Sequence, residues 1–172
     1  AASARRVLRA NDRIRVGCIG VGMNGSKMME ALARQGAASP TAAEVAGVSD
    51  IYARRKDWAR AALKLPANQV HHDYRDLIGR SDLDAVFISV PDHWHCRMTL
   101  DAMAAGKDVY LQKPMTLTIE EAREIAETAN RLGRVVQVGS QHLSDRRYHV
   151  PTSSSIRTST SASRGLSQVP PH

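Results

Sequence analysis

The stretch that decides the fold is Ile14-Arg-Val-Gly-Cys-Ile-Gly-Val-Gly-Met-Asn-Gly25. Its first half is a short apolar run, which is typical of a buried strand, and it leads directly into three glycines with the spacing Gly-X-Gly-X-X-Gly. Apolar residues at helical spacing follow: Met28, Met29 and Leu32. The predicted order is therefore strand, glycine turn and helix, which a chain needs where its backbone approaches a pyrophosphate.

Each glycine of this loop has a separate predicted role in binding a dinucleotide. Gly20 permits the tight turn, Gly22 leaves out the side chain that would block the phosphates, and Gly25 lets the helix lie close to the strand. Met23 and Asn24 lie between the second and third glycines and belong to the same predicted binding loop. The free N–H groups of the helix start favour an anion there. The alternative is a glycine-rich turn without a ligand.

Strands and helices alternate beyond this loop. Further strands are predicted over residues 43–49, near Val70, and over 84–90, 108–111 and 134–138; helices are predicted over 53–65, 74–78 and 95–105. A last helix begins at Thr118, where Thr118 and Glu121 have capping-box spacing, and Gly133 is expected to end it in a left-handed conformation. Its predicted apolar face is Ile119, Ala122, Ile125, Ala126 and Ala129. Six alternating strands predict an α/β fold, a doubly wound and mostly parallel sheet of the Rossmann type.

The ends of the chain differ in character from its middle. Residues 151–172 contain ten Ser or Thr, three Pro and no acidic residue among 22 positions. We therefore expect an N-terminal arm over residues 1–12, a dinucleotide-binding domain over 13–148, and a disordered or out-of-frame tail over 149–172. A frameshifted or truncated gene would explain this tail.

The charge of the chain is basic, with 24 Lys and Arg against 17 Asp and Glu and a net charge of +7. Its placement does not predict a nucleic-acid face, because arginines cluster in the first ten residues and in the tail while most others alternate with acids. A single Phe offers no platform on which bases could stack. No apolar run is long enough to predict a membrane span.

Cysteines and histidines do not predict a metal site. Cys18 and Cys96 form no CxxC pair and are expected to be buried or half-buried thiols. His71-His72-Asp73 and His93-Trp-His95-Cys96 are poorly spaced for a structural zinc, and we predict a loop or substrate-side role for His93-Trp-His95.

Asp50 ends the second predicted strand, where a carboxylate can accept hydrogen bonds from both ribose hydroxyls and repel a 2′-phosphate. This favours NAD over NADP as the cofactor. Arg54 and Arg55 follow closely and could accommodate a phosphate, although solvated helix surface is the simpler interpretation of both.

Lys113 follows the fifth predicted strand at its carboxyl end, where open α/β sheets bind ligands. Its ammonium could polarise a carbonyl or hydroxyl of a substrate. The alternative is a surface lysine that precedes a proline turn.

From Asn11 to Tyr148 the chain resembles the Gfo/Idh/MocA family, which contains glucose-fructose oxidoreductase and inositol dehydrogenase. The motifs that carry the resemblance are Ile14–Gly25, Val90-Pro-Asp-His-Trp-His95, Gln112-Lys-Pro114 at the family's Glu-Lys-Pro position, and Val136-Gln-Val-Gly-Ser-Gln141. The resemblance implies that Val90, Pro91 and His93 line the cofactor. It also implies that Lys113 is a catalytic residue that reaches substrate and nicotinamide, and that Gln141 lies near the ring.

The resemblance further implies an NAD(P)-dependent oxidoreductase that acts on a sugar or polyol hydroxyl by hydride transfer. Two departures stand out: Gln112 replaces the family's Glu, and the C-terminal substrate domain with its main catalytic histidine is absent from this sequence. The alternative is a non-catalytic NAD-binding or sensor fragment. A full-length protein is expected to form homo-oligomers through that second domain. The segment 1–12 resembles the region after a twin-arginine signal, so either a cytoplasmic or an exported, periplasmic location is expected.

Overall fold

The structure is a computed structural model that describes residues 13–39 and 43–140 of the 172-residue chain. The predicted arm and tail, and with them the domain limit at residue 148, lie outside the described residues. The strands are β1 (Arg15–Ile19), β2 (Glu44–Ser49), β3 (Val70–His71), β4 (Ala85–Ile88), β5 (Asp108–Gln112) and β6 (Val136–Gly139). The helices are α1 (Met23–Ala38), α2 (Ala53–Ala62), α3 (Tyr74–Ile78), α4 (His95–Ala104) and α5 (Ile119–Leu132), with 3-10 turns η1 (Ala67–Gln69) and η2 (Asp92–Trp94).

The six strands form one sheet with the order β3-β2-β1-β4-β5-β6, and every neighbouring pair is parallel. This confirms the predicted doubly wound sheet of the Rossmann type, and it is fully parallel. The strand order reverses between β1 and β4, where the chain leaves the middle of the sheet in opposite directions. Open α/β sheets bind their ligands outside the carboxyl ends of the strands at such a switch point.

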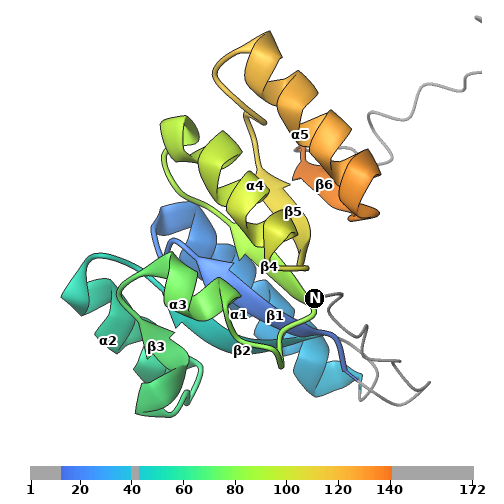
Figure 1. Ribbon diagram of the computed structural model, residues 1–172. Helices are drawn as coiled ribbons and strands as arrows, with labels where there is room; N and C mark the ends of the chain where they lie inside the picture. The colour runs from blue at the N-terminus through green and yellow to red at the C-terminus, as the bar shows by residue number, and fades with distance from the viewer. Residues whose placement is uncertain (1–12, 40–42, 141–172) are drawn as a thin grey trace, which may run out of the picture. The chain divides into compact units, whose positions relative to one another are not determined.

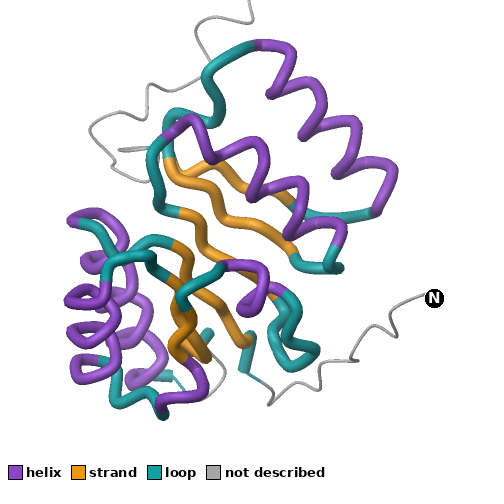
Figure 2. Tube along the Cα trace, turned by 60° about the vertical axis from the view of Figure 1, so that its left-hand side comes forward, coloured by secondary structure: helices purple, strands orange, loops and turns teal. Residues whose placement is uncertain are grey.

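Helices cover both faces of the sheet, so the central strands β1 and β4 are buried beyond their first residues (Figures 1 and 2). On one face, Met29 of α1 and Ala59 of α2 pack with Cys18, Val48 and Phe87 of the strands. The core of the other face is formed by α3, α4 and α5, and its fully buried side chains include Leu77, Val86, Ile88, Ala102, Leu111 and Ile125.

Both cysteines are buried and free, as predicted. Cys18 lies within β1, and burial raises its pKa to about 12. The thiol therefore stays protonated and contributes to packing as a small apolar side chain.

Several predicted limits differ from the structure. The strand predicted over residues 84–90 ends at Ile88, because Ser89 and Val90 already turn towards the glycine loop. The helix predicted over 53–65 ends at Ala62, and α1 continues to Ala38, beyond the predicted helical spacing of Met28, Met29 and Leu32. A glycine is needed at position 36 because α1 lies close to the start of β2. A Cβ on Gly36 would be only 2.6 Å from the carbonyl oxygen of Ala43.

The predicted start and end of α5 are confirmed. Thr118 accepts a hydrogen bond from the Glu121 backbone while the Glu121 side chain bonds back, and Gly133 ends the helix with φ of 60°. The predicted apolar face was partly wrong: Ile119 is 77% exposed and Ala126 is also exposed. Ile119 is the first residue of α5. Ala126 follows the buried Ile125 and therefore points about 100° around the helix axis from it.

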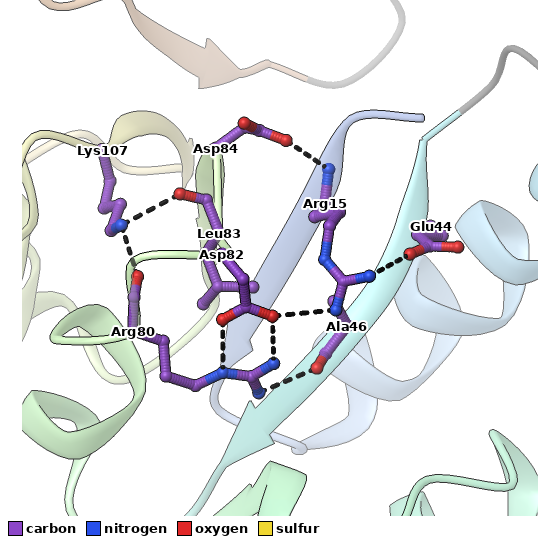
Figure 3. Close-up of polar contacts among 8 residues, drawn as sticks. All are labelled: Arg15, Glu44, Ala46, Arg80, Asp82, Leu83, Asp84 and Lys107. Carbon is purple, nitrogen blue, oxygen red and sulfur yellow. Dashed lines mark hydrogen bonds and ion pairs between the residues drawn. The ribbon is translucent and has the colours of Figure 1, made fainter. Parts of the chain in front are cut away.

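A polar network joins β1, β2 and the segment before β4 at the amino edge of the sheet (Figure 3). Arg15 contacts Glu44 at 2.9 Å and Asp82 at 2.9 Å, and Arg80 donates two hydrogen bonds to Asp82. The hydrogen-bonded Arg80 guanidinium lowers the pKa of Asp82 to about 2. This network lies at the opposite edge of the sheet from the switch-point cavity described below.

Lys107, in the turn before β5, is a buried cation that belongs to the same edge. Its side chain is only 5% exposed and donates hydrogen bonds to the carbonyl oxygens of Arg80 at 2.6 Å and Leu83 at 2.9 Å. Burial lowers its pKa. The ammonium therefore satisfies two backbone acceptors of the turn that leads into β4.

Candidate functional site

A cavity of about 740 Å³ lies at the carboxyl edge of the sheet, at the switch point between β1 and β4. Its walls come from the segments that follow β1, β2, β3, β4 and β5. They include, in chain order, Gly20, Gly22, Met23, Asn24, Asp50, Ile51, Arg55, His72, Tyr74, Val90, Pro91, His93, Trp94, Gln112 and Lys113. The structure thus brings most of the predicted site residues together around one volume.

Two glycines of the loop are required by the protein itself. Gly20 has φ of +91°, which L side chains rarely adopt, and a Cβ there would be 2.2 Å from the carbonyl oxygen of Ser89. A Cβ on Gly25 would be 2.0 Å from the carbonyl oxygen of Gly20. Gly25 therefore lets α1 begin directly against the end of β1, as its predicted packing role requires.

Gly22 is different, because nothing in the part of the chain that the structure describes demands a glycine there. Its backbone is extended, with φ of −71° and ψ of −173°, and the nearest heavy atom to a Cβ at this position would be Nη1 of Arg55 at 3.9 Å. The position caps α1 without a side-chain hydrogen bond and lines the cavity. The space that a side chain would fill is therefore open to a ligand at the N-terminus of a 16-residue helix.

Asp50 lies at the carboxyl end of β2 and is only 7% exposed. Its Oδ2 accepts a hydrogen bond of 2.7 Å from the N–H of Val21, and its Oδ1 accepts one of 2.8 Å from the N–H of Tyr52. These bonds hold the carboxylate against the glycine loop. A carboxylate accepts about four hydrogen bonds, so capacity remains for hydroxyl groups in the cavity.

Arg55, for which helix surface was the simpler of two interpretations, lies at the site. Its Nη1 lies 3.9 Å from Oδ2 of Asp50, and its side chain lines the cavity. Its guanidinium also lies 5.8 Å from the ring centre of Tyr52. The Arg55 side chain is 52% exposed, so it is solvated helix surface and a wall of the cavity at the same time. Periodicity could not reveal this, because the first turn of α2 is exposed on most of its circumference.

A second hollow, of about 320 Å³, shares Gly22, Met23 and Arg55 with the larger cavity. Arg54, Arg55, Tyr52 and Trp58 contribute to its walls. Its two guanidinium groups make it the more cationic end of the site.

The loop between β3 and α3 forms another wall that the sequence interpretation did not assign. His72 to Arg75 line the cavity, and the Tyr74 hydroxyl donates a 2.6 Å hydrogen bond to Asp101 of α4. Arg97 donates to the same carboxylate at 3.0 Å. This wall is therefore held against α4 by a shared acceptor.

The segment after β4 carries the predicted cofactor-lining residues. Val90, Pro91 and His93 all line the cavity, and so does Trp94, which is 43% exposed and was not predicted. Trp94 presents an aromatic ring beside the His93 imidazole, with 6.2 Å between ring centres.

Lys113 lines the cavity from the end of β5, which is where its predicted role requires it. The side chain of Gln112 accepts a 2.9 Å hydrogen bond from the Lys113 backbone N–H through Oε1. A glutamate carboxylate could accept the same bond, so the Gln112 replacement keeps this backbone contact and removes only the charge. Gln141, the remaining predicted site residue, lies outside the described residues.

The histidines do not form a metal centre. Within residues 13–39 and 43–140, no group of three or more His, Cys, Asp or Glu side chains could hold a metal ion. His95 is 1% exposed, and its two ring nitrogens contact the backbone carbonyl oxygens of Pro114 and Val90.

Among the helices that the structure describes, none combines the length and apolar character that a membrane span requires.

Comparisons with known proteins identify the family of the chain. The model of the Gfo/Idh/MocA group, described as an oxidoreductase family with an NAD-binding Rossmann fold, matches residues 14–140. Inositol 2-dehydrogenase of Klebsiella pneumoniae is 39% identical over 140 residues, which cover 78% of this chain and 39% of that protein. A glycosyl hydrolase family 109 protein of Shewanella baltica is 34% identical over 127 residues, covering 70% of this chain and 27% of that protein.

Solved structures give the same result. Scyllo-inositol dehydrogenase from Lactobacillus casei, with bound cofactor NAD(H) and scyllo-inositol, matches with a TM-score of 0.67 and 26% identity. The match covers 74% of this chain and 36% of that one. The chain therefore spans less than half the length of the relatives that it matches.

Proposed function

Since the chain belongs to the Gfo/Idh/MocA family of oxidoreductases with an NAD-binding Rossmann fold, we propose that it binds NAD in the switch-point cavity as part of a dehydrogenase for sugar or polyol hydroxyls. The family assignment agrees with the predicted resemblance. It favours an enzyme over the non-catalytic sensor fragment. The polyol class is supported by inositol 2-dehydrogenase among the relatives.

The observation that carries the proposal is the open space at Gly22. A Cβ at this position would be no closer than 3.9 Å to a heavy atom of another part of the protein, whereas Gly20 and Gly25 are each required by backbone contacts near 2 Å. A glycine that the protein does not need, at the start of a helix and on a cavity wall, fits a pyrophosphate. Met23 and Asn24 complete this proposed phosphate loop.

Asp50 supports NAD rather than NADP. Its carboxylate is buried and held by two backbone N–H groups, so it cannot easily move away from a ligand. Both ribose hydroxyls of NAD could donate to it, whereas a 2′-phosphate would meet a like charge. Arg54 and Arg55 offset part of that repulsion, so we propose a preference for NAD rather than exclusion of NADP.

Residues after β4 and β5 would form the nicotinamide and substrate end of the site. We propose that Val90, Pro91 and His93 line the cofactor and that the Lys113 ammonium donates a hydrogen bond to the reacting oxygen of the substrate. Bound NAD would supply the hydride acceptor. Lys113 would then stabilise the negative charge that develops on that oxygen, while the hydroxyl proton passes to the catalytic histidine that the family resemblance implies. The proposed role of Gln141 is to lie near the nicotinamide ring.

The test is calorimetric titration of the purified 172-residue chain with NADH and NADPH, together with circular dichroism to establish that the chain is folded. We expect NADH to bind more tightly than NADPH. A folded chain that binds neither nucleotide would refute the proposal. Equal affinity for both would retain the cavity as the binding site and refute the role of Asp50 in selection.

A further inference from the structure

His95 connects two walls of the cavity. It is the first residue of α4, and its imidazole is 1% exposed. Nδ1 lies 2.6 Å from the carbonyl oxygen of Pro114, and Nε2 lies 3.0 Å from the carbonyl oxygen of Val90. Pro114 directly follows Lys113, and Val90 follows β4 beside the glycine loop.

Both partners of the ring are acceptors. A neutral imidazole has one N–H and can donate to only one of the two carbonyls, whereas a ring with hydrogen on both nitrogens donates to both. In each form the ring holds at least one of the two backbone segments. A buried polar side chain whose contacts are both to cavity-lining backbone is placed to control the shape of the cavity.

The turn that carries Lys113 depends on this contact. Lys113 and Pro114 are exposed, and the Lys113 N–H is bonded to Gln112 on the same strand. Among the described residues, the hydrogen bond between His95 and the Pro114 carbonyl is the one that links this Lys113-Pro114 turn to a different element. Without it, the apolar packing of Met115 would be left to hold the turn.

The Val90 carbonyl links the same ring to the glycine loop. Ser89, the residue before Val90, has the carbonyl oxygen that a Cβ on Gly20 would approach to 2.2 Å, and its N–H bonds to Ile19. One side chain therefore joins the turn of Lys113 to the strand end that packs against the glycine loop.

We propose that His95 is a positioning residue, which holds Lys113 and the Val90 segment at a fixed separation around the nicotinamide end of the cavity. This rests on the proposed function, because it needs a nicotinamide nucleotide between the two walls. His95 itself is covered by α4 and the two backbone segments, so it acts through Lys113 and Val90 rather than on the substrate.

The test compares NADH with ADP-ribose, which lacks the nicotinamide half, on the 172-residue chain and its variants. His95→Leu removes both polar contacts, and His95→Gln keeps an amide that can donate to a carbonyl. Thr99→Val is the matched control: Thr99 is fully buried on the same helix, and its hydroxyl has no hydrogen-bond partner among the described residues. Circular dichroism and urea unfolding are measured for each variant.

We expect His95→Leu to bind NADH about 10-fold more weakly, as the loss of a positioning hydrogen bond predicts, and to keep its ADP-ribose affinity within about 2-fold. His95→Gln should recover part of the loss. Where the leucine variant does not fold, His95→Asn replaces it, because its shorter amide reaches at most one carbonyl.

The positioning role would be overturned if His95→Leu and Thr99→Val had the same ratio of NADH affinity to ADP-ribose affinity. Equal weakening of both ligands would also overturn it, because it would reduce His95 to a general stabilising residue. Failure of the unsubstituted chain to bind either ligand would instead refute the proposed function, so the two failures are distinguishable.

Discussion

Substitution of Gly22 by serine separates the needs of the ligand from the needs of the fold. The position is the N-cap of α1, it has extended backbone angles, and the nearest heavy atom to a Cβ there would be 3.9 Å away. Serine is favoured over glycine at an N-cap by a few tenths of a kcal/mol, so Gly22→Ser should leave the free energy of unfolding unchanged or slightly raised. The folded protein should accept this side chain without strain.

The cavity should not accept it together with a pyrophosphate. The new Cβ and hydroxyl would occupy the space in front of the helix start, and forcing extra atoms into a filled space costs about 1–3 kcal/mol. That penalty corresponds to NADH affinity about 5- to 150-fold weaker. Calorimetric titration with NADH, beside urea unfolding of the same sample, measures both quantities.

Gly25→Ala provides the contrasting variant. Its Cβ would be 2.0 Å from the carbonyl oxygen of Gly20, so α1 must shift away from β1, and we expect a loss of stability of about 1–3 kcal/mol or more. A Gly22→Ser protein that is as stable as the parent and binds NADH equally well would refute the reasoning, since the open space at Gly22 would then have no connection with the ligand.

Three further predictions concern the site and the opposite, amino edge of the sheet. Asp50→Asn should weaken NADH binding about 10-fold and reduce the preference over NADPH, because an amide accepts through one oxygen only and carries no charge; an unchanged preference in competitive titration would contradict this. Because Arg80 lowers the pKa of Asp82 to about 2, the carboxylate stabilises the fold fully above its unfolded pKa, and this contribution is lost as the pH falls through the folded value. The urea unfolding midpoint of Asp82→Asn should therefore fall less than that of the parent protein as the pH is lowered from about 5 to 2. Parallel pH dependences of the two midpoints would disprove the linkage. Lys107→Met should lower the free energy of unfolding by about 2–4 kcal/mol, because the buried carbonyls of Arg80 and Leu83 lose their donor; a loss below about 0.5 kcal/mol in urea unfolding would exclude that role.

The order of elements was predictable because it depends on local patterns. The apolar run before Gly20, the glycine spacing and the capping box at Thr118 each act over a few residues, and the parallel sheet and the limits of α5 agree with them. Limits that depend on packing were less predictable. The strand that was predicted to reach Val90 ends at Ile88, because the chain turns to meet the glycine loop.

The position of the site also followed from local signals, since residues at the carboxyl ends of parallel strands must meet at one edge of the sheet. Gly22, Asp50, Val90 and Lys113 line one cavity, as their positions in the chain led us to expect. The roles of these residues in binding a cofactor remain predictions that the titrations test.

The amino-acid sequence by itself determined the class of fold, the glycine loop and the family resemblance, because each is carried by residues that are close together in the chain. Only the tertiary structure decided which glycine is left for the ligand, that Arg55 approaches Asp50, and that His95 lies between the carbonyls of Val90 and Pro114. These contacts join residues of different elements, such as His95 and Pro114, which are 19 positions apart, and they exist only once the strands are ordered and the helices are packed. No periodicity or motif encodes such distances, since they are set by the way the sheet brings its strand ends together.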